Sequence, residues 1–222
     1  ATRDRIKAYA REIGYIYNRR AASLRTSRSG ILGVVVHDIM NPFFAEILRS
    51  IESELDRSRQ TFLLSNHYDK LEKQRTFIDT LLQLGADGVI MSPAIGTPAE
   101  DIRLAEENGL PAVLIARSVE GADVPVFRGD DAYGTGLATD HLIELGHRRI
   151  VMIGGTDQTS TGRDRYQGYV AAMRAAGVEP PADWRIPGPR TKQAGFEAAR
   201  SFLAHKDKPT AAVCFNDLVA IG

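Results

Sequence analysis

The sequence has little cysteine and no long apolar run. Its single cysteine, Cys214, excludes a disulfide within the chain, and the apolar run at 211–215 predicts a buried thiol that packs as a small hydrophobic group. The longest apolar runs, such as 31–36 and 112–116, are far shorter than the roughly 20 residues that span a bilayer, so no transmembrane helix is predicted. The first residues are charged and lack the apolar stretch of a secretory signal, which predicts a cytoplasmic protein without a membrane partner.

Motifs of common enzyme classes are also absent. The sequence has no GxxxxGKS or GxxxxGKT phosphate loop, no GxSxG nucleophile elbow and no GxGxxG after a predicted strand. Its carboxylates show no spacing that implies acid–base catalysis. His141 and His147 straddle a glycine, without a cysteine or a third histidine near them, so we predict neither a metal site nor a cofactor. These absences predict a protein that is not an enzyme.

The net charge of zero conceals an uneven distribution of charge. Residues 1–29 hold eight basic and two acidic side chains, a local balance of +6, so the remaining residues sum to −6. A solvated helical face is the ordinary explanation of a charge run. Here the basic excess ends abruptly at Gly30, and a short basic arm on an acidic body is typical of a segment that contacts nucleic-acid phosphates. The basic residues of this arm are Arg3, Arg5, Lys7, Arg11, Arg19, Arg20, Arg25 and Arg28.

From residue 31 onward, short apolar runs alternate with amphipathic segments. Such alternation requires parallel strands joined by right-handed crossovers, so the predicted fold class is α/β with doubly wound parallel sheets. Four of the expected helices end at a glycine suited to a left-handed cap: Gly85, Gly109, Gly146 and Gly177. The predicted strands are 31–36, 61–65, 88–91, 112–115, 124–127, 149–154 and 210–215. The predicted helices are 2–13, 44–59, 71–84, 99–108, 132–145, 164–176 and 192–205.

A second series of alternating elements begins near 129–131. Two lobes of similar construction would then face each other across a cleft. Ligands of such sheets bind beyond the carboxyl ends of the strands, so we expect the loops after residues 36, 65, 91, 115, 154 and 215 to converge on a ligand. The second series stops at Gly222, just after Asn216 caps a new helix, and we expect this lobe to be incomplete.

Several motifs follow one another in a specific order along nearly the whole chain. They read TRDRI from residue 2, GYIYNRRAASLRT from 14, ILGVVV from 31, NPFF from 41, LEKQR from 71, HLIELGH from 141 and NDLVAIG from 216. Each motif alone is a weak signal, but their order resembles the lac/gal repressor (LacI/GalR) family of bacterial transcription regulators. In that family a helix-turn-helix headpiece and a hinge helix precede a two-lobed core similar to periplasmic sugar-binding proteins.

The resemblance implies four parts in this chain. Residues 1–17 correspond to the last helix of a truncated headpiece, and the helix that reads the major groove would lie upstream. Residues 18–29 correspond to the hinge helix and linker, 30–129 to the N-terminal effector-binding lobe, and 130–222 to an incomplete C-terminal lobe.

The resemblance also implies how the hinge contacts DNA. Asn18 would cap the hinge helix, and the small side chains of Ala21 and Ala22 would let two hinge helices approach closely. Leu24 would wedge into the minor groove and kink the duplex. Tyr17 stands where the family more often has proline. The implied DNA-binding residues are Asn18, Arg19, Arg20, Ala21, Leu24 and Arg25.

An effector site at the strand ends is the second implication. An arginine at the place of Arg165 forks onto ligand oxygens in relatives, which suits its planar donors. Two alternative roles remain open: helix capping for Thr161 and for either Asn216 or Asp217, and core packing for one of two adjacent phenylalanines. Ala116 stands where many relatives carry an aspartate, and Arg117 follows it, so the effector need not be a neutral sugar. The predicted effector-binding residues are Asn41, Phe43, Phe44, Asn66, Ser92, Thr161, Arg163, Arg165, Asn216 and Asp217.

Together these features predict a ligand-responsive transcription regulator, most often a repressor in this family, that binds a palindromic operator as a homodimer. A small effector, a sugar or a related metabolite, would close the cleft and change the population of ordered hinge helices. The rival prediction is a periplasmic-type solute-binding or sensor protein without DNA binding, because both classes share the two-lobed core. The basic arm favours the regulator, since a secreted binder has no use for it.

Overall fold

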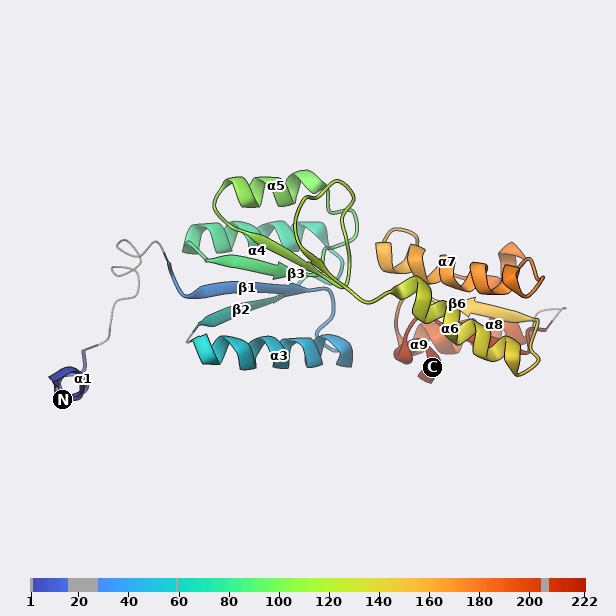
Figure 1. Ribbon diagram of the computed structural model, residues 1–222, viewed down its shortest axis with the longest axis horizontal. Helices are drawn as coiled ribbons and strands as arrows, with labels where there is room; N and C mark the ends of the chain where they lie inside the picture. The colour runs from blue at the N-terminus through green and yellow to red at the C-terminus, as the bar shows by residue number, and fades with distance from the viewer. Residues whose placement is uncertain (1, 16–27, 59, 205–207) are drawn as a thin grey trace.

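A computed structural model describes residues 2–15, 28–58, 60–204 and 208–222. The elements after residue 30 form two lobes, each with a parallel sheet covered by helices (Figure 1), so the predicted α/β class is confirmed. The predicted hinge segment 18–26 lies outside the described residues. Helix α1 covers Thr2–Glu12, and the apolar side chains of this segment, Ile6, Tyr9 and Ile13, are exposed.

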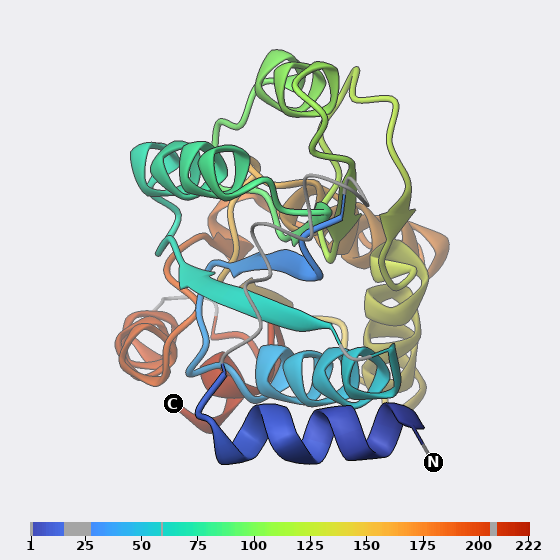
Figure 2. The same cartoon turned by 90° about the vertical axis from the view of Figure 1, so that its left-hand side faces the viewer.

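The first lobe is built on a five-stranded sheet in the order β2-β1-β3-β4-β5, in which every neighbouring pair is parallel. Helix α3 covers one face of this sheet, and α4 and α5 cover the other (Figures 1 and 2). Its strands are β1 (Ile31–Val36), β2 (Thr61–Asn66), β3 (Gly88–Met91), β4 (Ala112–Ile115) and β5 (Val126–Phe127). Its helices are α3 (Pro42–Ser58), α4 (Leu71–Leu84) and α5 (Ala99–Glu107).

The main core of the first lobe lies between the sheet and helices α4 and α5. Val35, Leu81 and Leu114 are fully buried there. Gly33 in β1 allows α4 to approach, because a Cβ atom at this position would lie 2.1 Å from Cδ1 of Leu81. This packing fixes the carboxyl ends of the strands, where the loops that line the cleft begin.

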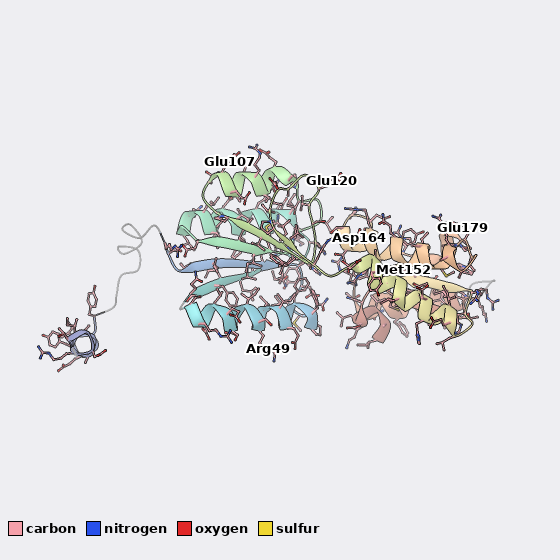
Figure 3. All side chains as sticks on the ribbon, in the orientation of Figure 1. Arg49, Glu107, Glu120, Met152, Asp164 and Glu179 are labelled. Carbon is pink, nitrogen blue, oxygen red and sulfur yellow. The ribbon has the colours of Figure 1, made fainter. Side chains whose placement is uncertain are left out.

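The second lobe has a three-stranded parallel sheet in the order β7-β6-β8. The central strand β6 is buried along its whole length; Met152, labelled in Figure 3, belongs to it. Helices α6 and α7 pack closely, since a Cβ on Gly168 would lie 2.0 Å from the carbonyl oxygen of Ala132. The strands are β6 (Ile150–Ile153), β7 (Arg185–Ile186) and β8 (Ala211–Cys214). The helices are α6 (Asp131–Glu144), α7 (Ser160–Ala175), the short 3-10 helix η1 (Ala182–Trp184), α8 (Lys192–Leu203) and α9 (Asp217–Ile221).

The predicted helices and strands that fall within the described residues are all present, with differences at particular ends. Helix α7 begins at Ser160 rather than at 164, because the Thr159 side chain caps it by accepting a hydrogen bond of 3.1 Å from the Gly162 N–H. Only residues 126–127 of the predicted strand 124–127 pair with β4. The sequence did not predict β7. The four expected glycine caps are confirmed, since Gly85, Gly109, Gly146 and Gly177 all have positive φ.

Two expectations concerned what the sequence lacks. Cys214 is half-buried rather than fully buried, so the prediction of a buried thiol is right only in part; burial raises the pKa of the thiol, which keeps it protonated near neutral pH. None of the helices in the described ranges combines the length and the apolar character that a bilayer crossing requires.

Candidate ligand-binding cleft

The two lobes meet where the chain passes from β5 into α6, and side chains reinforce this junction. The Thr161 hydroxyl at the start of α7 donates a hydrogen bond of 2.8 Å to the carbonyl oxygen of Ala116. Arg128 forms an ion pair with Asp164, which lies at the junction in Figure 3. These contacts hold the start of α7 against the turn after β4 and against the segment that follows β5.

A cleft of about 770 Å³ lies between the lobes. Loops that follow β1, β2 and β3 line it from the first lobe, and loops that follow β6 and β7 line it from the second. The predicted convergence is therefore confirmed for the strands that end near residues 36, 65, 91 and 154, whereas the loops after 115 and 215 contribute no lining residue within the described ranges. A smaller cavity of about 250 Å³ is lined by the second lobe alone. The lining residues of the cleft are His37, Asp38, Met40, Asn41, Tyr68, Asp69, Ile95, Gly155, Thr156, Gln158, Pro187, Gly188, Pro189, Arg190 and Thr191.

The carboxylate of Asp69 is held by two arginines from different lobes. Arg117, from the turn after β4, bonds both oxygens of Asp69 and also donates to the carbonyl oxygen of Pro93 at 2.7 Å. Arg190 reaches Asp69 from the second lobe, across the cleft. Burial acts to raise the pKa of Asp69, but the hydrogen bonds and the charge of Arg117, with the charge of Arg190, hold that pKa well below its usual range. Asp69 is therefore ionised at any functional pH.

Two histidines beside this ion cluster are neutral. Burial lowers the pKa of His37 to about 3, and the charges of the two arginines act in the same direction. Burial also lowers the pKa of His67. Nδ1 of His67 accepts the Asp69 N–H at 3.0 Å, so its Nε2 carries the proton and donates to the carbonyl oxygen of Ser92 at 2.8 Å. Within the described ranges no three His, Cys, Asp or Glu side chains form a group that could hold a metal ion.

Buried polar atoms at the carboxyl edge of the first sheet have no hydrogen-bond partner among the described residues. They are Nδ1 of His37, both amide atoms of Asn66 and the hydroxyl of Ser92. Asn66 is the register partner of Val36, and the Ser92 N–H donates to Val35, so these two predicted residues lie on either side of the end of β1. Since buried polar groups nearly always have partners, these atoms are suited to a polar ligand or an ordered water.

The aromatic pair at the start of α3 divides into one core ring and one exposed ring. Phe44 is 2% exposed and packs edge-on against His37, with ring centroids 4.7 Å apart. Phe43 is 54% exposed. The prediction that one of the two rings serves the core is confirmed. Asn41 lines the cleft, and its Oδ1 accepts the Phe43 N–H at 3.1 Å.

The predicted residues of α7 bind other parts of the protein. The capping alternative for Thr161 is wrong, because Thr159 caps α7 and the Thr161 hydroxyl bonds the first lobe. The exposed Arg163 donates to a backbone carbonyl of the preceding loop at 2.8 Å. Arg165 donates to the carboxylate of Asp131 at 2.8 Å and to the carbonyl oxygen of Phe215. Its guanidinium also lies over the aromatic ring of Phe215, 4.6 Å from the ring centroid. These three side chains do not line the cleft in the described structure.

The remaining predicted residues lie at the start of α9 or outside the described ranges. Oδ1 of Asn216 accepts the Val219 N–H at 3.0 Å, which confirms the capping alternative for this residue. Asp217 is exposed in the first turn of α9, and neither side chain lines the cleft within the described residues. All six predicted DNA-binding residues lie outside the described ranges: Asn18, Arg19, Arg20, Ala21, Leu24 and Arg25.

The prediction missed the charged and polar residues of the cleft lining other than Asn41, and four of them show which signals the sequence offered. His37 directly follows the predicted strand 31–36, and Asp69 lies four residues after the predicted strand 61–65. These positions at strand ends could have indicated that both side chains lie at the cleft. Tyr68 gave the same signal. Arg190 lies in a Gly-Pro-Arg loop after a strand that the sequence did not reveal, so nothing local marked it.

The chain is similar to known proteins along most of its length. A family model described as periplasmic binding proteins and sugar binding domain of the LacI family matches residues 29–222. The chain is 33% identical over 223 residues to the maltose regulon regulatory protein MalI of Escherichia coli (strain K12), a match that covers 100% of this chain and 65% of that protein. The chain thus spans somewhat less than two thirds of this curated relative.

Solved structures of similar architecture support the same grouping. A LacI family transcriptional regulator from Mycobacterium smegmatis superimposes with a TM-score of 0.74 at 28% identity, covering 86% of this chain and 69% of that one. A LacI family transcriptional regulator from Enterococcus faecium with bound ribose gives a TM-score of 0.73 at 28% identity, with the same coverage of 86% and 69%.

Proposed function

Because this chain belongs to the LacI family, we propose that it forms the effector-binding part of a bacterial transcription regulator. The similar proteins are transcriptional regulators and not enzymes. The observation that carries the proposal is the cleft between the lobes, which loops from both lobes line at the carboxyl ends of their strands. A ligand in this cleft contacts both lobes at once, so it can favour one relative position of the lobes over another.

The proposed effector is a small, sugar-like molecule. The Enterococcus faecium regulator was solved with ribose, and MalI is described as a maltose regulon protein. In this chain the cleft combines polar groups such as Asp38 and Asn41 with the exposed ring of Tyr68. Hydroxyl edges and C–H faces of a sugar need this combination. Of the residues predicted from the sequence, the proposed site keeps Asn41, which lines the cleft, and Asn66 and Ser92, whose buried polar atoms have no partner among the described residues. An effector-binding role stays a prediction for the others, which do not line the cleft within the described ranges: Phe43, Phe44, Thr161, Arg163, Arg165, Asn216 and Asp217.

The proposed DNA contacts lie in the basic arm. Arginines of the arm would bind phosphates, and Leu24 would enter the minor groove at the centre of a palindromic operator. The protein would act in the cytoplasm as a homodimer, with its two-fold axis matched to that of the operator. The division into parts at 1–17, 18–29, 30–129 and 130–222 belongs to the same proposal.

The hinge residues would couple the two sites. If effector binding changes DNA affinity by some factor through the hinge helices, DNA binding changes effector affinity by the same factor. This reciprocity separates a regulator from a solute-binding protein, which would bind the same sugar without any response to DNA.

The full-length protein provides the test. An operator is selected from a randomised DNA pool, and its affinity is measured by fluorescence anisotropy at increasing salt, with and without each sugar of a panel. We expect a linear fall of log affinity with log salt and a change of at least about fivefold on adding the effector, which corresponds to about 1 kcal/mol of coupling. Binding of a sugar without any DNA binding at low salt would favour the rival solute-binding function.

A further inference from the structure

The ion cluster at the cleft, formed by Asp69, Arg117 and Arg190, contains two cations but one carboxylate. Asp69 is the only carboxylate that the described residues place between Arg117 and Arg190. All three side chains are shielded from solvent: Arg117 is 6% exposed, Asp69 is 15% exposed and Arg190 is 18% exposed. Charged groups so placed are expensive unless they are paired.

Arg117 alone provides a hydrogen-bond donor for each carboxylate oxygen of Asp69. Its Nη1 and Nη2 atoms bond the two carboxylate oxygens, and Nη1 also donates to the carbonyl oxygen of Pro93. This bidentate pair lies entirely within the first lobe. If Arg190 moves away, Asp69 therefore keeps two charge-assisted hydrogen bonds.

Arg190 is the surplus cation, and it faces the cleft. One of its Nη atoms contacts Asp69, whereas its Nε and its other Nη have no acceptor among the described residues. The side chain lines the cleft between Pro189 and Thr191. A guanidinium with free donors in a fixed fork matches the oxygens of a carboxylate or a phosphate.

The backbone at this cluster is held in a conformation that side chains rarely adopt. Three residues other than glycine have positive φ within the described ranges: Tyr68 at +52°, Asp69 at +58° and Ala116 at +61°. They include Asp69 itself, the residue before it and the residue before Arg117. Such strain is concentrated at ligand sites, where the surrounding structure enforces it.

The remaining groups of the cleft are compatible with a ligand that is both acidic and hydroxylated. His37 is neutral, and its Nδ1 has no partner among the described residues. Asp38 is the other carboxylate of the lining; its Oδ1 accepts the Met40 N–H at 3.0 Å and leaves acceptor capacity for hydroxyl donors.

We propose that Arg190 binds an acidic group of the effector: a carboxylate or phosphate of a polyhydroxylated ligand replaces Asp69 on Arg190, while Asp69 stays paired with Arg117. This inference rests on the proposed function, because it assigns the effector to the same cleft. It narrows the effector from sugars in general to sugar acids and sugar phosphates.

Matched ligands on the full-length protein test this assignment. Glucose, gluconate and glucose 6-phosphate form one set, and ribose and ribose 5-phosphate form a second. Calorimetry and thermal shift should show an acidic member binding at least tenfold more tightly than the neutral member of its set. Preference for the carboxylate or for the phosphate then identifies which acidic group the cleft accepts.

Variants locate the acidic group. We expect Arg190→Gln to weaken the preferred acidic ligand roughly 10- to 100-fold and to leave the neutral member nearly unchanged, with Arg190→Lys intermediate. Arg174→Gln, which removes an exposed arginine paired with Glu179 elsewhere in the second lobe, is the matched control and should behave as the parent. Melting temperatures verify that each variant is folded.

The measurements distinguish a wrong assignment of Arg190 from a wrong proposed function. If neutral sugars bind and alter DNA affinity while acidic members bind no better, the acidic-group assignment is wrong and the proposed function stands. Equal loss of neutral and acidic ligands in Arg190→Gln also overturns the assignment, because the arginine would then serve only cleft structure. If no member of either set binds, the assignment fails together with the sugar-like effector.

Discussion

The hydroxyl of Thr161 donates a hydrogen bond of 2.8 Å to the carbonyl oxygen of Ala116, and this bond joins the start of α7 to the turn after β4. The preceding residue on the helix, Ser160, accepts the Ser118 N–H at 2.9 Å. Two successive residues of the second lobe thus hold one turn of the first lobe, so the first turn of α7 determines how the lobes meet.

Replacing both hydroxyls should loosen this junction. In the double variant Ser160→Ala with Thr161→Val, two partly buried hydrogen bonds are lost, at about 1 kcal/mol each in the free energy of unfolding. We also expect a larger radius of gyration in solution scattering and weaker effector binding. Thr161→Ser keeps the donor and serves as the control. Unchanged scattering and stability in the double variant would contradict a role for these bonds in lobe placement.

Stability should fall in mild acid because of His37. Burial lowers the pKa of His37 to about 3, below the ordinary value of 6.5. Below the ordinary pKa the unfolded chain binds a proton that the folded protein does not, so the free energy of unfolding decreases as pH falls. The expected slope is at most about 1.4 kcal/mol per pH unit for this histidine, and partial exposure reduces it.

Urea unfolding at pH 7, 6 and 5 measures this slope. His67 contributes in the same direction, since burial lowers its pKa too. His37→Gln should therefore flatten the profile without abolishing its slope, whereas His141→Gln, an exposed position in α6, should not change it. Asp69 contributes little in this range, because its ordinary pKa of 3.8 lies below pH 5. Identical profiles for the parent and His37→Gln would exclude the assignment.

A side chain at Gly155 should lower the stability of the protein more than a side chain at Gly96. It has a φ of +81°, and a Cβ atom there would lie 2.5 Å from Cδ2 of Phe215. Gly96 has nearly the same φ, +79°, but no atom within 4 Å of the added Cβ. Gly96→Ala should therefore cost only the backbone strain, about 1 to 2 kcal/mol. Gly155→Ala should add an overpacking cost of about 1 to 3 kcal/mol. Equal decreases of melting temperature in Gly155→Ala and Gly96→Ala would show that the Phe215 ring moves aside without a measurable loss of stability.

The sequence predicted the lobes because their elements obey local rules. The strand Ile31–Val36 and the helix Leu71–Leu84 are continuous apolar or amphipathic segments bounded by turn residues, and both were predicted with their observed bounds. The start of α7 was missed because its cap, Thr159, lies five residues before the predicted helix start at residue 164. β7 was missed because two residues that pair with β6 carry no periodicity.

The candidate site was less predictable, since its groups meet only in the folded protein. Asp69 and Arg190 are 121 residues apart in sequence, and no spacing rule connects them. Arg117 could be noticed only as a departure beside Ala116. By contrast, Asn41 could be placed at the cleft, because the strand before it predicts where its loop must lie.

The wedge role of Leu24 remains a prediction that a DNA-bending measurement can decide. An apolar side chain in the minor groove repays part of the cost of unstacking one base step, so Leu24→Ala in the full-length protein should bind the operator more weakly and bend it less. Its basic neighbours would still contact phosphates, and the slope of log affinity against log salt should stay close to that of the parent. The double variant Arg19→Gln with Arg20→Gln should instead keep the DNA bend of the parent. Its slope of log affinity against log salt should be shallower by up to about 2 per protomer. Because the two substitutions move different observables, bending by circular-permutation gels and affinity by salt titration separate the wedge from the charge. A parental bend in Leu24→Ala would assign the kink to some other part of the hinge.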